Sequence, residues 1–313
     1  KIIKLNKATE GSLETAYLAL KEMDIDGELY IHTSDICLPK PFKLEDRFDN
    51  NHSSAYTVTF KANNPSYSYC KLKDCSNEII DFMIEKEVVS QLANVGIYGF
   101  KSAQDFIKIA ESIINNRILV KNEYYISSVF SILFDQNEEV RSYFIEEAHI
   151  IGTPLELEFF INHVLKTMKP KTIGFVSDHS GFNFKEDLID LFKKNKFTTI
   201  DFGCYSLSDC DYSDYVPIAC KGIQDEEVEI VLGSCNSGQG VNISANKCKD
   251  IVSCLPLNEE LLTKSRMHNC PNFISFASCL WTPEQAYKAF IKSHSKTNFQ
   301  GGRHSLRLQK VLK

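Results

Sequence analysis

Residues 233–240 read Gly-Ser-Cys-Asn-Ser-Gly-Gln-Gly and place one thiol, Cys235, inside a glycine-rich loop. Two glycines separated by one residue, Gly238 and Gly240, let a backbone approach a ligand closely, and successive N–H groups at the start of a helix attract an anion. Such surroundings favour a thiolate over a thiol, so Cys235 is placed to act as a base or a nucleophile. A buried structural cysteine beside a tight turn is the plainer alternative.

Three further clusters carry groups that could bind a substrate or move a proton. They are Asp178 with His179, His268 with Asn269, and Arg303 with Arg307. The two arginines are four residues apart, so on a helix they share one face and could clamp a phosphate. Taken singly, each cluster has a structural alternative: a helix cap, a surface histidine and a solvated tail.

The second half of the chain alternates strands with helices. β-rich apolar runs predict strands at residues 172–176, 197–202, 228–232 and 272–276. Apolar residues at helical spacing follow the first strand: Phe184, Leu188, Leu191 and Phe192. This alternation predicts a Rossmann-like parallel sheet with helices on both faces. Asp178 and Cys235 then fall at carboxyl ends of strands, where open α/β sheets hold their ligands.

The first half is also of mixed α/β type. A helix is expected around Leu13 and Leu20, a strand at residues 29–33, and a second helix that Ser102 begins. Residues 38–80 are polar and poorly periodic, so no element is predicted there.

A boundary between two domains is expected at residues 165–171, which are polar and contain Pro170. The predicted domains are residues 1–165 and 171–313. Two domains also suit a length of 313 residues, since about 150 residues per domain is usual.

Composition narrows the class of protein. The chain is 43% hydrophobic, enough for a packed core, and its net charge of −6 argues against nucleic-acid binding. The longest apolar stretch, residues 124–134, is far below the roughly 20 residues of a membrane span. The 11 cysteines show no paired spacing, which argues against a disulfide framework or a zinc ribbon and predicts a cytoplasmic protein.

Six ordered motifs in residues 171–313 resemble the ribose-5-phosphate isomerase B and galactose-6-phosphate isomerase family. They are Ser-Asp-His-Ser-Gly-Phe at 177–182, Asp-Phe-Gly at 201–203, Asp-Tyr-Ser-Asp-Tyr at 211–215, the Cys235 loop running to Ala-Asn-Lys at 245–247, His268 with Asn269, and Gly-Gly-Arg-His at 301–304.

The resemblance implies an aldose–ketose isomerase that works through a cis-enediol. Cys235 would remove the proton next to the carbonyl, and Ser237 with loop N–H groups would stabilise the enediolate oxygen. Asp178 and His268 would assist ring opening and proton transfer. The implied substrate-binding residues are His179, Asn236, Gly238, Gly240, Asn269, Tyr212, Arg303 and Arg307, with His179 and the arginines on the phosphate. No cofactor is implied, and the site would be shared between subunits of a homodimer or homotetramer.

The sequence departs from this family at positions that would bind phosphate. Cys279 and Val252 stand where the family usually has arginine, and Ser213 stands where it usually has proline. Loss of a guanidinium removes a strong charge-assisted contact. A different substrate, a low affinity, or a non-catalytic sugar-phosphate-binding protein therefore stay open.

Residues 1–165 resemble part of the sugar-phosphate nucleotidyltransferases. The motifs are Thr-Glu-Gly-Ser at 9–12, Thr-Ser-Asp at 33–35, Glu-Lys at 85–86, Asn-Val-Gly-Ile-Tyr-Gly-Phe at 94–100, Glu-Tyr-Tyr at 123–125 and Ile-Gly-Thr-Pro at 151–154. The resemblance implies Asp35 as a Mg²⁺ ligand, Glu85 as a sugar-binding acid and Lys86 as a charge that steadies phosphates.

Two parts of the nucleotidyltransferase pattern are missing. Its triphosphate-gripping glycine-rich loop would lie upstream of Lys1, and Ile150 and Ile151 stand where a second metal carboxylate is expected. The N-terminal half is therefore either an inert scaffold for the isomerase half or an active transferase to which the isomerase-like half is accessory.

Overall fold

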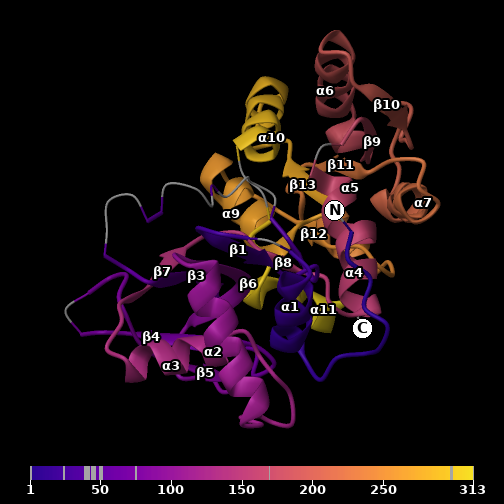
Figure 1. Cartoon of the computed structure of the whole chain (residues 1–313). Helices are drawn as coiled ribbons and strands as arrows, with labels where there is room; N and C mark the ends of the chain where they lie inside the picture. Colours follow the sequence, from indigo (N-terminus) through magenta and orange to yellow (C-terminus); the bar gives the residue numbers. More distant parts are fainter. Residues whose placement is uncertain are drawn as a thin grey trace. The chain divides into compact units, whose positions relative to one another are not determined.

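The computed structural model of this chain (Figure 1) describes residues 2–23, 25–38, 43, 47–48, 52–74, 76–168, 170–296 and 299–312. The chain divides into two compact units, Lys1–Gly152 and Thr153–Lys313. Among the described residues, every helix is too short or too polar to cross a membrane.

A five-stranded parallel sheet forms the middle of the C-terminal unit (Figure 1). Its strands run in the order β10 (Thr198–Asp201), β9 (Thr172–Ser177), β11 (Ile230–Cys235), β13 (Phe273–Ala277) and β12 (Ser253–Cys254). The four expected strands are confirmed. The sequence did not predict β12, because a two-residue strand is too short to show a period.

Helices cover both faces of this sheet, as expected. They are α6 (Phe182–Lys194), α7 (Tyr212–Gln224), α8 (Gln239–Ala245), α9 (Glu259–Asn269) and α10 (Pro283–Lys296); α11 (Arg303–Val311) packs on α9. Phe175 packs in one apolar cluster with residues of α6, α9 and α10, and its neighbour Val176 packs in another with residues of α7 and α8. Successive strand residues point to opposite faces, so an unbroken apolar strand serves two cores.

Phe192 of α6 lies at the centre of the first cluster and is fully buried. Four aromatic rings surround it at centroid distances between 5.0 and 5.4 Å, mostly edge to face: those of Phe175, Phe197, Tyr287 and Phe290. Aromatic pairs in this geometry add to the stabilisation that burial alone provides.

The boundary between the units lies at Gly152 and Thr153, ahead of the expected stretch at 165–171. Thr153 and Glu156 form a capping box that begins α4 (Pro154–Phe159), and the chain continues through the π-helical segment η1 (Phe160–Leu165) into α5 (Lys166–Met168). The proline expected to end this helix, Pro170, does follow it. The helical arm nevertheless packs with the C-terminal unit.

A buried guanidinium fastens this helical arm. Arg266 of α9 is fully buried and donates to the Thr167 carbonyl oxygen at 2.9 Å and to the Thr167 hydroxyl at 3.1 Å. His163 Nε2 donates to the carbonyl oxygen of Cys270 at 3.0 Å. Burial of a charge is costly unless it is hydrogen-bonded, so these contacts hold the arm in place.

The N-terminal unit is an α/β fold built on a mixed sheet. Its strands are β5 (Ile80–Glu85), β4 (Ser68–Leu72), β6 (Leu92–Phe100), β3 (Ala55–Lys61) and β7 (Val140–Phe144) in that order, with β1 (Leu29–His32) also paired to β6 and a separate pair of β2 (Ile36–Cys37) and β8 (His149–Ile150). Its helices are α1 (Ser12–Lys21), α2 (Ala103–Asn115) and α3 (Ser128–Asp135). The expected helices at α1 and α2 and the expected strand at β1 are confirmed.

Strands β3 and β4 lie in the stretch where no element was predicted. Thr57 and Thr59 are fully buried: the Thr57 hydroxyl donates to the Ile97 carbonyl oxygen at 3.0 Å, and Thr59 hydrogen-bonds Ser142 at 2.7 Å. Tyr56, Val58 and Phe60 alternate with these threonines, so β3 does carry the period-two pattern of a strand, which the largely polar sequence before it obscured. Residues 39–42, 44–46, 49–51 and 75 of that stretch lie outside the described residues.

Replacing Phe192 by Ala should lower the free energy of unfolding of the C-terminal unit by about 3 to 5 kcal/mol, because the ring leaves a cavity among four aromatic neighbours. The fluorescence of Trp281, the single tryptophan, reports urea unfolding of this unit. Leu257→Ala is the control, since that side chain is 59% exposed and its loss should leave the midpoint unchanged. Equal midpoints for the two variants would contradict the packing described.

Candidate active site

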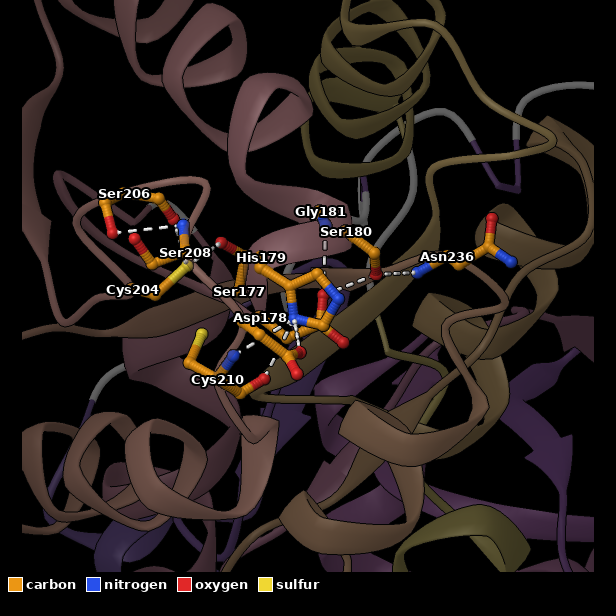
Figure 2. Close-up of polar contacts among 11 residues, drawn as sticks. Ser177, Asp178, His179, Ser180, Gly181, Cys204, Ser206, Ser208, Cys210 and Asn236 are labelled. Carbon is orange, nitrogen blue, oxygen red and sulfur yellow. Dashed lines mark hydrogen bonds and ion pairs between the residues drawn. The ribbon is translucent and has the colours of Figure 1, made fainter.

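The carboxyl ends of β9 and β11 bring two of the expected site segments together. These strands pair in parallel, with Ser177 opposite Ser234, so the residues that follow each strand are neighbours. Asp178 follows β9, and Cys235 is the last residue of β11. Figure 2 shows Asp178, His179, Ser180 and Asn236 gathered at this edge.

Asp178 is a buried carboxylate, 8% exposed, that caps the short 3₁₀ segment η2 (His179–Gly181). Its Oδ1 accepts two hydrogen bonds, from the Ser180 hydroxyl at 2.6 Å and from the Gly181 N–H at 3.0 Å. The Ser180 oxygen in turn accepts the Asn236 N–H at 2.9 Å (Figure 2). A chain of hydrogen bonds therefore joins Asp178 to the loop that carries Cys235.

Cys235 is 5% exposed and shares the apolar cluster of α7 and α8. Its carbonyl oxygen accepts the Ser278 N–H at 3.0 Å, and that of Asn236 accepts the Cys279 N–H at 3.1 Å. The loop is thus pinned by the segment after β13 as well as by Ser180. A buried thiol agrees with both the structural and the catalytic interpretation.

Glycine is required at position 238, which has φ of +70° and precedes α8. A Cβ there would lie 3.0 Å from the Ala277 backbone nitrogen, closer than side chains normally come. At Gly240 a Cβ would lie 2.3 Å from a ring carbon of Tyr212, so the structure places that predicted residue directly against the loop.

His179 is anchored through Nδ1. That nitrogen lies 3.2 Å from the Cys210 N–H donor, 3.0 Å from the Cys210 carbonyl oxygen and 3.2 Å from Asp209 Oδ1. The Cys210 pKa is raised to about 11, first by burial and then by the neighbouring Cys204 thiol. Figure 2 shows His179 bonded to the Cys210 backbone.

A second cluster of predicted residues is electropositive and lies on α9 and α11. The His268 ring stacks on the His304 ring with centroids 4.5 Å apart and planes 6° from parallel. Burial first, and then His268, Arg303 and Arg307, lower the pKa of His304 to about 4. Burial followed by Arg303, Lys264 and Arg307 lowers the pKa of His268. An anion would be favoured here.

The two clusters lie at opposite ends of the strands of one parallel sheet. Cys235 pairs with Ala277 at the carboxyl end of β13, whereas His268 and Asn269 precede the amino end of that strand. The strand between these two ends, β13, has five residues and is therefore about 15 Å long. One chain therefore does not bring the arginines to Cys235.

The predicted residues of the N-terminal unit are also in contact with polar neighbours. The Asp35 carbonyl oxygen accepts the Ile151 N–H at 2.8 Å. Burial raises the pKa of Glu85, which accepts a hydrogen bond from Ser127. The Lys86 ammonium lies 3.6 Å from Glu123 Oε2. In the part of the chain that the structure describes, no three acidic, histidine or cysteine side chains form a metal-binding group, so Asp35 as a ligand stays a prediction.

Comparison with known proteins concerns the C-terminal unit. A family model described as Ribose/Galactose Isomerase matches residues 173–311. The probable ribose-5-phosphate isomerase B of Mycoplasma pneumoniae is 30% identical over 141 residues, which are 45% of this chain and 92% of that protein. The chain belongs to the ribose/galactose isomerase family.

Other members of the family have similar sequence identity to this chain. The ribose-5-phosphate isomerase B of Escherichia coli is 29% identical over 144 residues, 45% of this chain and 94% of that protein. Among solved structures, that of Clostridium thermocellum ribose-5-phosphate isomerase B is 30% identical, with a TM-score of 0.43 and coverage of 45% and 95%. The Mycoplasma genitalium enzyme with bound ribulose-5-phosphate is 26% identical, with a TM-score of 0.42 and coverage of 45% and 93%.

Family membership supports a sugar-phosphate isomerase, and isomerases of this kind need no cofactor. Sequence analysis missed two side chains of the site, Ser180 and His304. Both stand inside motifs that mark the family, at 177–182 and 301–304. Their partners, Asn236 and His268, come from other elements and could not be read from the spacing.

Arg303→Gln should raise the pKa of His268 towards the ordinary value near 6.5, because it removes a positive charge that repels the imidazolium. The pH titration of the His268 ring by NMR measures this shift. Lys310→Gln on the same helix is the matched control and should leave the titration unchanged. A His268 pKa that stays the same or falls in R303Q would contradict the arrangement.

Proposed function

We propose that the C-terminal unit interconverts the aldose and ketose forms of a sugar phosphate through a cis-enediol. The observation that carries this proposal is the meeting of Asp178 with the Cys235 loop at the carboxyl edge of the sheet, in a chain of this family. A base and a second proton-transfer group at one edge are what a 1,2-proton shift needs.

The Cys235 thiolate removes the proton from the carbon next to the carbonyl, and negative charge moves to the carbonyl oxygen. The Cys235 thiol then returns the proton to the former carbonyl carbon. The Asn236 N–H is already bonded to Ser180, so the Ser237 hydroxyl and the later N–H groups of the loop stabilise that oxygen. Asp178 moves a proton between the sugar oxygens. The burial of Cys235 keeps water away from the base.

Two copies of the chain complete the site in this proposal. The arginines of α11 lie at the other edge of the sheet from Cys235, so a second subunit supplies Arg303, Arg307 and His268 to the sugar phosphate. A homodimer is the smallest assembly that does so, and a homotetramer of such dimers is the alternative. A two-fold axis would give each pair two equivalent sites.

Cys235→Ala should reduce isomerisation of ribose 5-phosphate, or of a hexose phosphate if that is the substrate, by about 1000-fold, since it removes the general base. Exchange of the transferred proton with deuterium from solvent should stop with it. Cys248→Ala is the control, because this half-buried thiol donates to the Ser244 carbonyl oxygen and lies beside the Cys220 thiol, beyond the end of α8. Full activity of C235A would overturn the mechanism.

Mixing variants tests the shared site in the same assay. C235A and a double variant, Arg303→Gln with Arg307→Gln, should each be inactive alone. After joint unfolding and refolding the mixture should regain about a quarter of wild-type activity, because half the pairs are mixed and each mixed pair has one intact site. No recovery would count against a site built from two subunits. Thermal stabilisation by a sugar phosphate without turnover would instead support a non-catalytic binding protein.

For the N-terminal unit the second candidate is a sugar-1-phosphate nucleotidyltransferase. The observation that favours it is the half-buried Glu85, whose pKa is raised by burial, in a unit where Asp35 lies against Gly152. A Mg²⁺ ion would be held by Asp35 together with substrate phosphates.

Release of pyrophosphate from a nucleoside triphosphate, a sugar 1-phosphate and Mg²⁺ measures this activity. Asp35→Ala should abolish it, whereas Asp81→Asn, an exposed carboxylate on β5, should leave it unchanged. Absence of pyrophosphate release by the wild-type chain would support the inert-scaffold interpretation.

A further inference from the structure

The side chain of Ser180 touches the segments that follow both strands of the candidate site. Its hydroxyl donates to Asp178 Oδ1 at 2.6 Å and accepts the Asn236 N–H at 2.9 Å (Figure 2). Its carbonyl oxygen accepts the Ser278 hydroxyl at 3.4 Å. Ser180 thus joins the segments that follow β9, β11 and β13.

The backbone around Ser180 is held by close packing against β11. A Cβ on Gly181 would lie 2.6 Å from the Ser234 carbonyl oxygen, so the two segments approach as closely as a glycine allows. The Ser234 hydroxyl also donates to the Gly181 carbonyl oxygen at 3.2 Å. With the backbone fixed, the serine hydroxyl has little freedom to choose other partners.

The direction of each hydrogen bond follows from the groups involved. A backbone N–H only donates, so the Ser180 oxygen must accept from Asn236, and its single proton goes to Asp178. Asp178 Oδ1 therefore accepts two hydrogen bonds, from Ser180 and from the Gly181 N–H. A proton that Asp178 takes up must then sit on Oδ2, the oxygen without a hydrogen-bond donor among the described residues.

We propose that Ser180 is a positioning residue for the isomerisation. It turns Asp178 so that Oδ2 exchanges the proton with the sugar, and it occupies the Asn236 N–H so that the developing oxyanion is directed to the following part of the loop. This role rests on the proposed function, since it requires a reaction at Cys235. Ser180 itself does not touch the substrate.

Ser180→Ala should lower kcat by about 10- to 100-fold, because a hydrogen bond to a charged group is lost, and should change KM little. Ser180→Thr keeps the hydroxyl and should restore most of kcat. Ser206→Ala is the matched control: its hydroxyl accepts the Ser208 N–H at 3.3 Å and has no contact with Asp178 or Asn236. The kcat and KM of S206A should equal those of wild type.

Hydrogen exchange at the Asn236 amide gives a second readout that does not need turnover. Exchange should speed up in S180A and stay at the wild-type rate in S180T and S206A, because only S180A removes the acceptor. Should S180A fail to fold, Ser180→Cys serves in its place, since a thiol of similar size is a weak acceptor and donor.

Three results separate this inference from the proposed function. A wild-type chain that isomerises no sugar phosphate overturns both. If the wild-type and S180A chains are equally active and the C235A chain is inactive, the proposed function stands and the proposed role of Ser180 is overturned. A loss of kcat in S180A that Thr does not restore, with unchanged Asn236 exchange, also overturns it, because the loss would then come from a general disturbance.

Discussion

The parallel pairing of β9 with β11 is the constraint on which the candidate site depends. Because Ser177 lies opposite Ser234, the chain leaves both strands at the same level and in the same direction. Asp178 and the Cys235 loop then meet although Asp178 and Cys235 are 57 positions apart along the chain. A shift of the register by one residue would turn the side chains to the opposite faces and separate the carboxylate from the thiol.

The same parallel arrangement explains why the two clusters of predicted residues lie apart within one chain. All strands of the C-terminal sheet run the same way, so a residue that precedes a strand and a residue that follows one lie at opposite edges. His268 belongs to the first kind and Cys235 to the second. The positive cluster around the stacked histidines therefore lies at the other end of β13 from the residue level of Cys235.

Sequence alone predicted the C-terminal fold, but it missed Ser180 in the first cluster and His304 in the second. Apolar periodicity was sufficient for the fold, since β9, β11 and β13 are buried on both faces. The strand β3 was missed although Tyr56, Val58 and Phe60 alternate with Thr57 and Thr59, because the sequence that precedes it is largely polar. Apolar periodicity also could not show that Ser180 would bridge two strands, because that contact depends on how β9 and β11 pair.

The domain boundary differs for a related reason. Pro170 correctly ended a helix, but the end of a helix is not the end of a domain when that helix packs onto the C-terminal sheet and its helices. The contact that decides this, Arg266 with Thr167, joins residues 99 positions apart. No pattern in the linker itself carries that information.

The buried Arg266 determines which residues the isomerase unit needs in order to fold as a separate fragment. The family match begins at residue 173, yet the carbonyl and hydroxyl that solvate this guanidinium belong to Thr167. A fragment that began at residue 173 would lack Thr167, so the buried Arg266 guanidinium would lose these hydrogen-bond partners. The helical arm at 153–168 is thus structurally part of the isomerase unit. A transfer of this unit to another protein would have to include the arm.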